Sequence, residues 1–95
     1  MDSVEWDEEK NLANIAKHGV SFEAAIGIFD GPTAEAADDR FDYGECRMVS
    51  VGIAQGRVLV VVSTMRGETR RIISARIASR NERQAYHQKT GAGGG

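Results

Sequence analysis

Arginine is the residue type in this chain that most suggests chemistry, because it is concentrated in one half. Residues 46–95 contain nine basic residues, eight of them arginine, and only two acidic ones. If residues 69–75 form a strand that continues to Arg76, alternation places Arg70 and Arg76 on one face and Arg71 on the other. Guanidinium groups bind phosphate oxygens in pairs and stabilise the charge that develops when phosphate is attacked. We therefore expect a phosphate-binding surface here; the alternative is a set of salt bridges to acidic residues elsewhere.

His18 is the first candidate for moving a proton. Histidine is the side chain best suited to general acid or base catalysis near neutral pH, for example in attack of a ribose 2′-hydroxyl on phosphate. His18 directly precedes Gly19 at the expected end of a helix, where a histidine can also serve simply as a favourable cation. Glu45 and Arg47 form a second candidate pair, base and phosphate clamp, or else an ion pair worth at most about 1 kcal/mol.

The charges are unevenly distributed along the chain. The 95 residues carry a net charge of −2, yet residues 1–45 hold twelve acidic and three basic residues, a net of −9, and residues 46–95 sum to +7. Asymmetry of this kind is a hint of nucleic-acid binding. The alternative is that the two halves fold together and neutralise each other.

Several classes of protein do not fit the composition. No apolar run approaches the ~20 residues of a membrane span. The first ten residues, MDSVEWDEEK, are too acidic for a signal peptide, so we expect a cytoplasmic protein. Cys46 is the single cysteine, expected to be a small buried hydrophobe, and no Cys/His cluster has zinc-ligand spacing. We expect no metal and no cofactor.

The N-terminal part reads as one short strand and two helices. Residues 4–6 resemble an edge strand, and Asp7 is a good N-cap for a helix that Gly19 ends. Leu12, Ile15 and Ala16 have the spacing of its apolar stripe. A second helix is expected from Ser21 to Phe29, because Pro32 cannot continue it.

The second half reads as a sheet followed by a helix. Residues 33–46 suggest a loop or weak strand, and residues 47–54, 57–65 and 69–75 an antiparallel meander. Ser79 and Glu82 form a capping box that starts a last helix. The expected fold is α+β, with two N-terminal helices and a C-terminal helix packed on an antiparallel sheet of three to four strands. We expect one domain over residues 1–89 and a disordered glycine-rich tail over residues 90–95.

Three segments together resemble the BrnT family of toxins from type II toxin–antitoxin systems. The first is EWDEEK with Asn14 and the run KHGVSF that begins at Lys17; the second is GECR followed by Val51-Gly52. The third is RIISARIA, which begins at Arg71, followed by Glu82-Arg83 and Tyr86. They span residues 5 to 86, and their order and spacing make the resemblance specific.

The resemblance implies a RelE-like fold and a ribonuclease neutralised by an antitoxin of the BrnA type. It also implies promoter DNA binding only by the toxin–antitoxin complex, through the antitoxin. The site residues that it carries over are His18 with Lys17, Arg47, Arg66 and Arg76.

The resulting hypothesis is a metal-independent endoribonuclease that acts on RNA by 2′-hydroxyl attack and leaves a 2′,3′-cyclic phosphate. Arg66 and Arg76 would neutralise the phosphate, Arg47 would clamp it, and His18, or else Glu45, would move the proton. Lys17, Arg70 and Arg71 would add RNA contacts. The alternatives are a non-catalytic module that binds nucleic acid or an antitoxin, and, less favoured, a relative directed at DNA gyrase.

Overall fold

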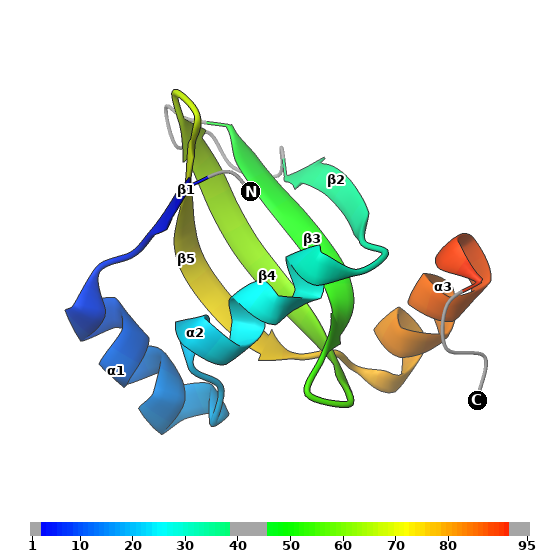
Figure 1. Ribbon diagram of the computed structural model, residues 1–95. Coiled ribbons are helices and arrows are strands. Elements are labelled where there is room, and N and C mark those ends of the chain that lie inside the picture. Colours follow the sequence, from blue (N-terminus) through cyan, green and yellow to red (C-terminus); the bar gives the residue numbers. More distant parts are fainter. Residues whose placement is uncertain (1–2, 39–45, 92–95) are drawn as a thin grey trace.

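One five-stranded sheet organises the protein. In the computed structural model, which describes residues 3–38 and 46–91, the strands lie in the order β1-β5-β4-β3-β2 (Figure 1). The strands are β1 (Ser3–Glu5), β2 (Ala34–Asp38), β3 (Arg47–Ala54), β4 (Arg57–Arg66) and β5 (Thr69–Ile77). The helices are α1 (Glu8–His18), α2 (Phe22–Ala25), the 3₁₀ helix η1 (Ile26–Asp30) and α3 (Arg80–Thr90). The predicted α+β class is confirmed.

Strands β3, β4 and β5 form the predicted antiparallel meander at the centre of the sheet. The β3–β4 turn has Gln55 at φ 53° and Gly56 at φ 74°, the two positive values that a type I′ hairpin turn requires. The β-branched run of β4 is buried along most of its length, as expected of a central strand.

The two edges of the sheet differ from the prediction. Strand β1 pairs with β5 in parallel, so the sheet is mixed and not purely antiparallel. The segment predicted as a loop or weak strand contains β2, which pairs antiparallel with β3. A strand that arrives from a distant part of the chain is free to pair in either direction, and sequence alternation does not encode that choice.

The helical part also differs from the prediction. Only α1 is a full N-terminal helix: α2 is a single turn, and the chain then tightens into η1. Gly27, in the middle of the predicted second helix, has low helix propensity, and a Cβ there would lie 3.3 Å from the Cβ of Ala54. The RelE-like arrangement stays a prediction.

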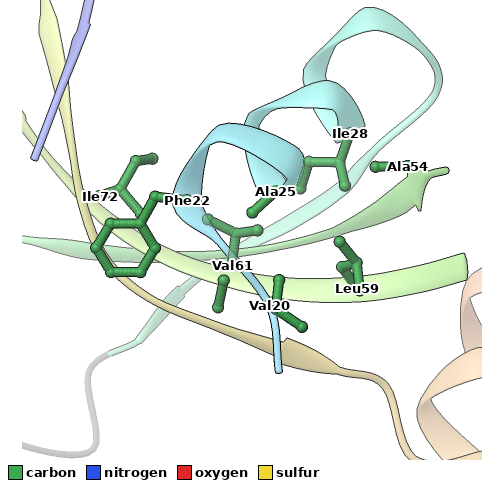
Figure 2. Close-up of a cluster of buried hydrophobic side chains, with 9 residues drawn as sticks. Val20, Phe22, Ala25, Ile28, Ala54, Leu59, Val61 and Ile72 are labelled. Atoms are coloured by element: carbon green, nitrogen blue, oxygen red, sulfur yellow. The ribbon is translucent and has the colours of Figure 1, made fainter. Parts of the chain in front are cut away.

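The two faces of the sheet carry different cores. On the face that α2 crosses, which we call the α2 face, Phe22, Ala25 and Ile28 pack against Leu59 and Val61 (Figures 1 and 2). On the opposite face, which we call the α3 face, Tyr86 packs against Val58, Val60 and Ala78. The α3 face is the less extensively covered of the two, because Tyr86 is the only buried residue of α3.

Helix α1 meets the sheet through amides and not through the predicted apolar stripe. Leu12 is 60% exposed and Ile15 is 40% exposed, whereas Asn11 and Asn14 are buried. The Asn14 side chain donates to the Ala75 carbonyl at 2.8 Å and accepts from the Ala75 N–H at 3.2 Å. Because β1 pairs only with residues 69–71 of β5, Asn14 supplies the hydrogen bonds that a longer β1 would have made.

The helix caps, Cys46 and the C-terminal tail were also predicted. Asp7 caps α1 by accepting from the Glu9 N–H, and Ser79 and Glu82 form the capping box of α3, as predicted. Cys46 is exposed, so its predicted burial is wrong. Helix α3 runs to Thr90, and residues 92–95 of the predicted tail lie outside the described residues. In the described part of the chain, no helix has the length and apolarity needed to span a membrane.

A buried glycine provides a test of this packing. A Cβ at Gly52 would lie 2.8 Å from the Ile28 Cβ and 3.2 Å from the Ile28 carbonyl oxygen, so Gly52→Ala should push η1 away from β3. We expect a loss of roughly 1–3 kcal/mol in the free energy of unfolding, measured by urea denaturation. Gly31→Ala is the control, because nothing lies within 4 Å of its Cβ position. Equal stability of the two variants would contradict the packing described.

Candidate functional site

A row of polar side chains crosses the sheet on the α3 face. Arg47 of β3 lies directly opposite Thr64 of β4, and Thr64 lies directly opposite Arg71 of β5. The row continues to Asp38 of β2, opposite Arg47, and to Glu5 of β1, opposite Arg71. Directly opposite residues share a face, so two arginines flank one threonine. We call Arg47, Thr64 and Arg71 the arginine row.

The contacts of the row hold its members in place. Arg71 donates to Glu5 at 2.5 Å, and the Thr64 hydroxyl donates to the Cys46 carbonyl at 2.8 Å. Thr64 is 2% exposed, and both arginines are half-buried. A partly buried positive charge attracts an anion more strongly than a fully solvated one, because less water screens it. The row thus places two half-buried guanidinium groups on either side of one hydroxyl, with Glu5 paired to Arg71 and Asp38 opposite Arg47.

A bulge in β5 overturns the predicted arrangement of the arginines. Val62 lies opposite Ser74 but the next residue, Ser63, lies opposite Ile72, so Ile73 is an extra residue in β5. A bulge of this kind reverses the alternation of the strand beyond it. The prediction that Arg70 and Arg76 share a face is therefore wrong: Arg76 shares the α3 face with Arg71, and Arg70 lies on the α2 face.

On the α2 face, Arg70 links its own strand, β5, to three other elements. It donates to the buried Ser63 hydroxyl at 3.0 Å, contacts Glu35 of β2 at 3.4 Å, and lies 4.3 Å from the ring centroid of Phe29. These contacts join β5, β4, β2 and η1. Arg70 therefore has a structural role, apart from the arginine row.

Arg76 is held by the first turn of α3. Its two terminal nitrogens donate to the two carboxylate oxygens of Glu82 at 2.7 and 2.8 Å. The same carboxylate accepts from the Ser79 N–H at 2.8 Å in the capping box. The Arg76 guanidinium and the Ser79 N–H together lower the pKa of Glu82 from 4.5 to about 2, although partial burial opposes the shift. Glu82 is therefore ionised at neutral pH and fixes the position of Arg76.

The remaining predicted site residues lie apart from the row. Arg66 is exposed at the end of β4, two residues beyond Thr64, and alternation gives it the α3 face. Lys17 and His18 occupy the last turn of α1. His18 follows Asn14 by one helical turn, so it lies near the end of β5 that carries Arg76 and away from Arg71.

The described residues offer little for a metal. Within residues 3–38 and 46–91, no group of three or more His, Cys, Asp or Glu side chains is placed to hold an ion. Glu45, the alternative base, lies outside the described residues.

Sequence reasoning missed two members of this region. Thr64 gave no signal, because its importance depends on its cross-strand neighbours. Glu82 was recognised only as a capping residue. The sequence did hint at its contact with Arg76. Glu82 follows Arg76 by six residues, and the chain turns from strand to helix between them, which brings the two side chains together.

Comparison with known proteins identifies one family. The family model described as "Ribonuclease toxin, BrnT, of type II toxin-antitoxin system" matches residues 6–82. A search of curated proteins returns no match. The matched region contains the whole arginine row and ends at Glu82.

The link between Arg76 and Glu82 predicts a pH dependence. Because folding lowers the pKa of Glu82, its contribution to stability is present above pH 4.5 and is lost as the pH falls toward about 2. Glutamine at this position retains the cap and removes the titration. We expect the melting temperature of the wild type to fall more steeply over this range than that of Glu82→Gln. The exposed Glu68→Gln is the control; parallel curves for wild type and Glu82→Gln would contradict the assignment.

Proposed function

Because the chain belongs to the BrnT family of ribonuclease toxins of type II toxin–antitoxin systems, we propose that its RNA-binding site is centred on the arginine row of the α3 face. The observation that carries this proposal is the direct cross-strand alignment of Arg47, Thr64 and Arg71. The protein is proposed to be a metal-independent endoribonuclease.

The row fits one phosphate group of an RNA strand. Neighbouring strands are spaced by about 4.8 Å, so the backbones of Arg47 and Arg71 are about 10 Å apart, with the short Thr64 between them. Two long guanidinium side chains can converge on an anion placed above Thr64. Arginine remains protonated, so both residues would bind the phosphate and stabilise its developing charge, and neither would act as a base.

Other arginines extend the proposed surface along the same face. Arg76 lies opposite Val60, four residues along β4 from Thr64, or about 13 Å. Arg76 would therefore contact a different phosphate from the one held by the row. Arg66, at the other end of β4, would do the same. Arg70 is left out of the proposed surface, because it points to the opposite face and joins structural elements there.

Proton transfer is assigned to His18, next to Lys17, or to Glu45. The proposed step is attack of the ribose 2′-oxygen on the adjacent phosphorus: the new P–O bond forms, the bond to the 5′-oxygen breaks, and a 2′,3′-cyclic phosphate remains. The base accepts the 2′-hydroxyl proton, and a proton is returned to the leaving 5′-oxygen. His18 lies near Arg76 and away from Arg71, so it would serve as the base for a phosphate bound beside Arg76; for a phosphate held in the row the proposed base is Glu45, which precedes Arg47 by two residues in the sequence.

The proposed partner is an antitoxin protein of the BrnA type that covers the RNA-binding surface. Promoter DNA would be bound only by the toxin–antitoxin complex, through the antitoxin. The cytoplasm, where RNA is available, is the proposed location.

Substitutions in the row test the proposal. We expect Arg47→Ala and Arg71→Ala each to reduce the rate of RNA cleavage by roughly 10²–10³-fold, because each removes a charge that stabilises the transition state. The assay follows a labelled RNA in the presence of EDTA, and mass spectrometry of the products should find 2′,3′-cyclic phosphate ends.

The control is Arg80→Ala, an exposed arginine at the start of α3, which should cleave RNA at the wild-type rate. Thermal melts establish that each variant is folded. Arg47→Lys keeps the positive charge but removes the planar guanidinium that can make two parallel hydrogen bonds, so it shows which of the two properties matters. RNA binding without cleavage in the wild type would favour the non-catalytic module. Full cleavage activity in folded Arg47→Ala would show that the arginine row is not part of the RNA-cleaving site.

A further inference from the structure

Strand β2 offers an edge for a partner strand. It is the last strand of the sheet, and in the described part of the chain it pairs with β3 on one side only. Its residues are mostly exposed. An edge strand carries backbone N–H and C=O groups that can pair with another chain. Two hollows flank this edge, one on each face of the sheet.

An acidic cleft of about 620 Å³ lies on the α2 side of β2. Three of its lining residues are carboxylates, Glu23, Asp30 and Glu35, and its one basic residue, Arg70, already contacts Glu35 and Ser63. Phe29 and Ile26 add apolar walls. A cleft with this lining suits the long aliphatic stem and positive end of a lysine or arginine.

An apolar groove of about 190 Å³ lies on the α3 side of the same strand. Ala34 and Ala36 of β2 form one wall, Val49 and Val51 of β3 the floor, and Tyr86 of α3 the other wall. The charged residues Glu82 and Lys89 of α3 also line the groove. Small alanines leave space that an aliphatic side chain can fill.

From these three features we propose that the β2 edge binds an extended segment of the antitoxin in which basic residues alternate with aliphatic ones. Side chains of a strand point alternately to the two faces of the sheet. A strand added to β2 would therefore direct every second residue toward the acidic cleft and the intervening residues toward the apolar groove. This is recognition by strand addition, with the backbone giving affinity and the two hollows giving specificity.

The position of β2 also explains how such a segment would silence the toxin. Asp38, at the end of β2, lies opposite Arg47 of the arginine row. An added strand would pass about 10 Å from Arg47, two strand spacings away. A chain that continued from it over the α3 face would cover the arginine row. This step rests on the proposed function, whereas binding at the edge does not.

The exposed residues Leu12 and Ile15 of α1 are the competing surface. They lie on α1, which packs against β5 next to the short edge strand β1, and neither residue lines the acidic cleft or the apolar groove. They therefore serve as the control surface in the experiment.

The probe is a synthetic peptide, Val-Lys-Val-Lys-Val-Lys-Val, with blocked ends and a fluorescent label. Binding to the intact protein is measured by anisotropy, and amide hydrogen exchange locates the bound segment. We expect Ala36→Lys, which places a positive charge in the groove, and the double variant Glu23→Gln/Asp30→Asn each to weaken binding at least about tenfold. Leu12→Glu should bind like the wild type. Bound peptide should slow exchange in residues 34–38.

Two further peptides test whether the alternating order and the positive charge of the probe are needed for binding. A peptide with the same composition but its lysines in one block should bind at least about tenfold more weakly, because it cannot fill both hollows. A peptide with glutamate in place of lysine should not bind at the edge. Equal binding of the block peptide, stronger binding of the glutamate peptide, loss of binding in Leu12→Glu, or unchanged exchange in residues 34–38 would each overturn the proposal.

The two proposals fail in distinguishable ways. The double variant Glu23→Gln/Asp30→Asn should keep wild-type RNA cleavage while losing the peptide, because both residues line the cleft on the α2 side, on the opposite face of the sheet from the arginine row. If Arg47→Ala retained cleavage while peptide binding behaved as expected, the proposed RNA site would be wrong and the edge would stand. If cleavage depended on Arg47 but the alternating and block peptides bound equally well, the proposed binding at the β2 edge would be wrong and the proposed RNA site would stand.

Discussion

The bulge in β5 is the constraint on which the arrangement of the charged residues depends. The extra residue, Ile73, allows Ile72 and Ala75 to enter the same core on the α2 face although they are three residues apart. The same shift turns Arg71 and Arg76 to the α3 face and leaves Arg70 alone on the other. Without the bulge, a strand that buried Ile72 would have put Arg76 on the side of the α2 core.

Each of three arginines on β5 has a carboxylate partner from a different element. Arg70 contacts Glu35 of β2, Arg71 contacts Glu5 of β1, and Arg76 contacts Glu82 of α3. The first two of these pairs join the acidic half of the chain to the basic half, so the opposing charges of the two halves are partly neutralised in the fold, one of the two outcomes that the charge distribution allowed. These ion pairs also fix the guanidinium groups in place, and an RNA phosphate would meet arginines already oriented by the protein.

Much of the fold could be predicted from local sequence signals. The capping residues Asp7 and Ser79, the Gln55-Gly56 turn and the buried run of β4 all depend on neighbours in the chain, and all are as expected. The bulge at Ile73 could not be read from alternation, because it depends on which residues the opposite strand presents. The buried face of α1 could not be predicted either, since Asn14 is buried for its bonds to the backbone of Ala75 in β5 and Asn11 for its bond to the Phe22 N–H. For the same reason the predicted site contained Arg47 and Arg71 but not their alignment across Thr64.

Arg47 and Arg71 are proposed to hold one phosphate together. A double-mutant cycle on the cleavage rate, with Arg47→Ala, Arg71→Ala and the combined variant, tests this proposal most directly, because coupled residues give non-additive losses. If they do, the combined variant should lose far less activity than the product of the two single losses, since either substitution alone already breaks the site. Losses that simply multiply would contradict it, because they would mean that the two arginines act at separate places.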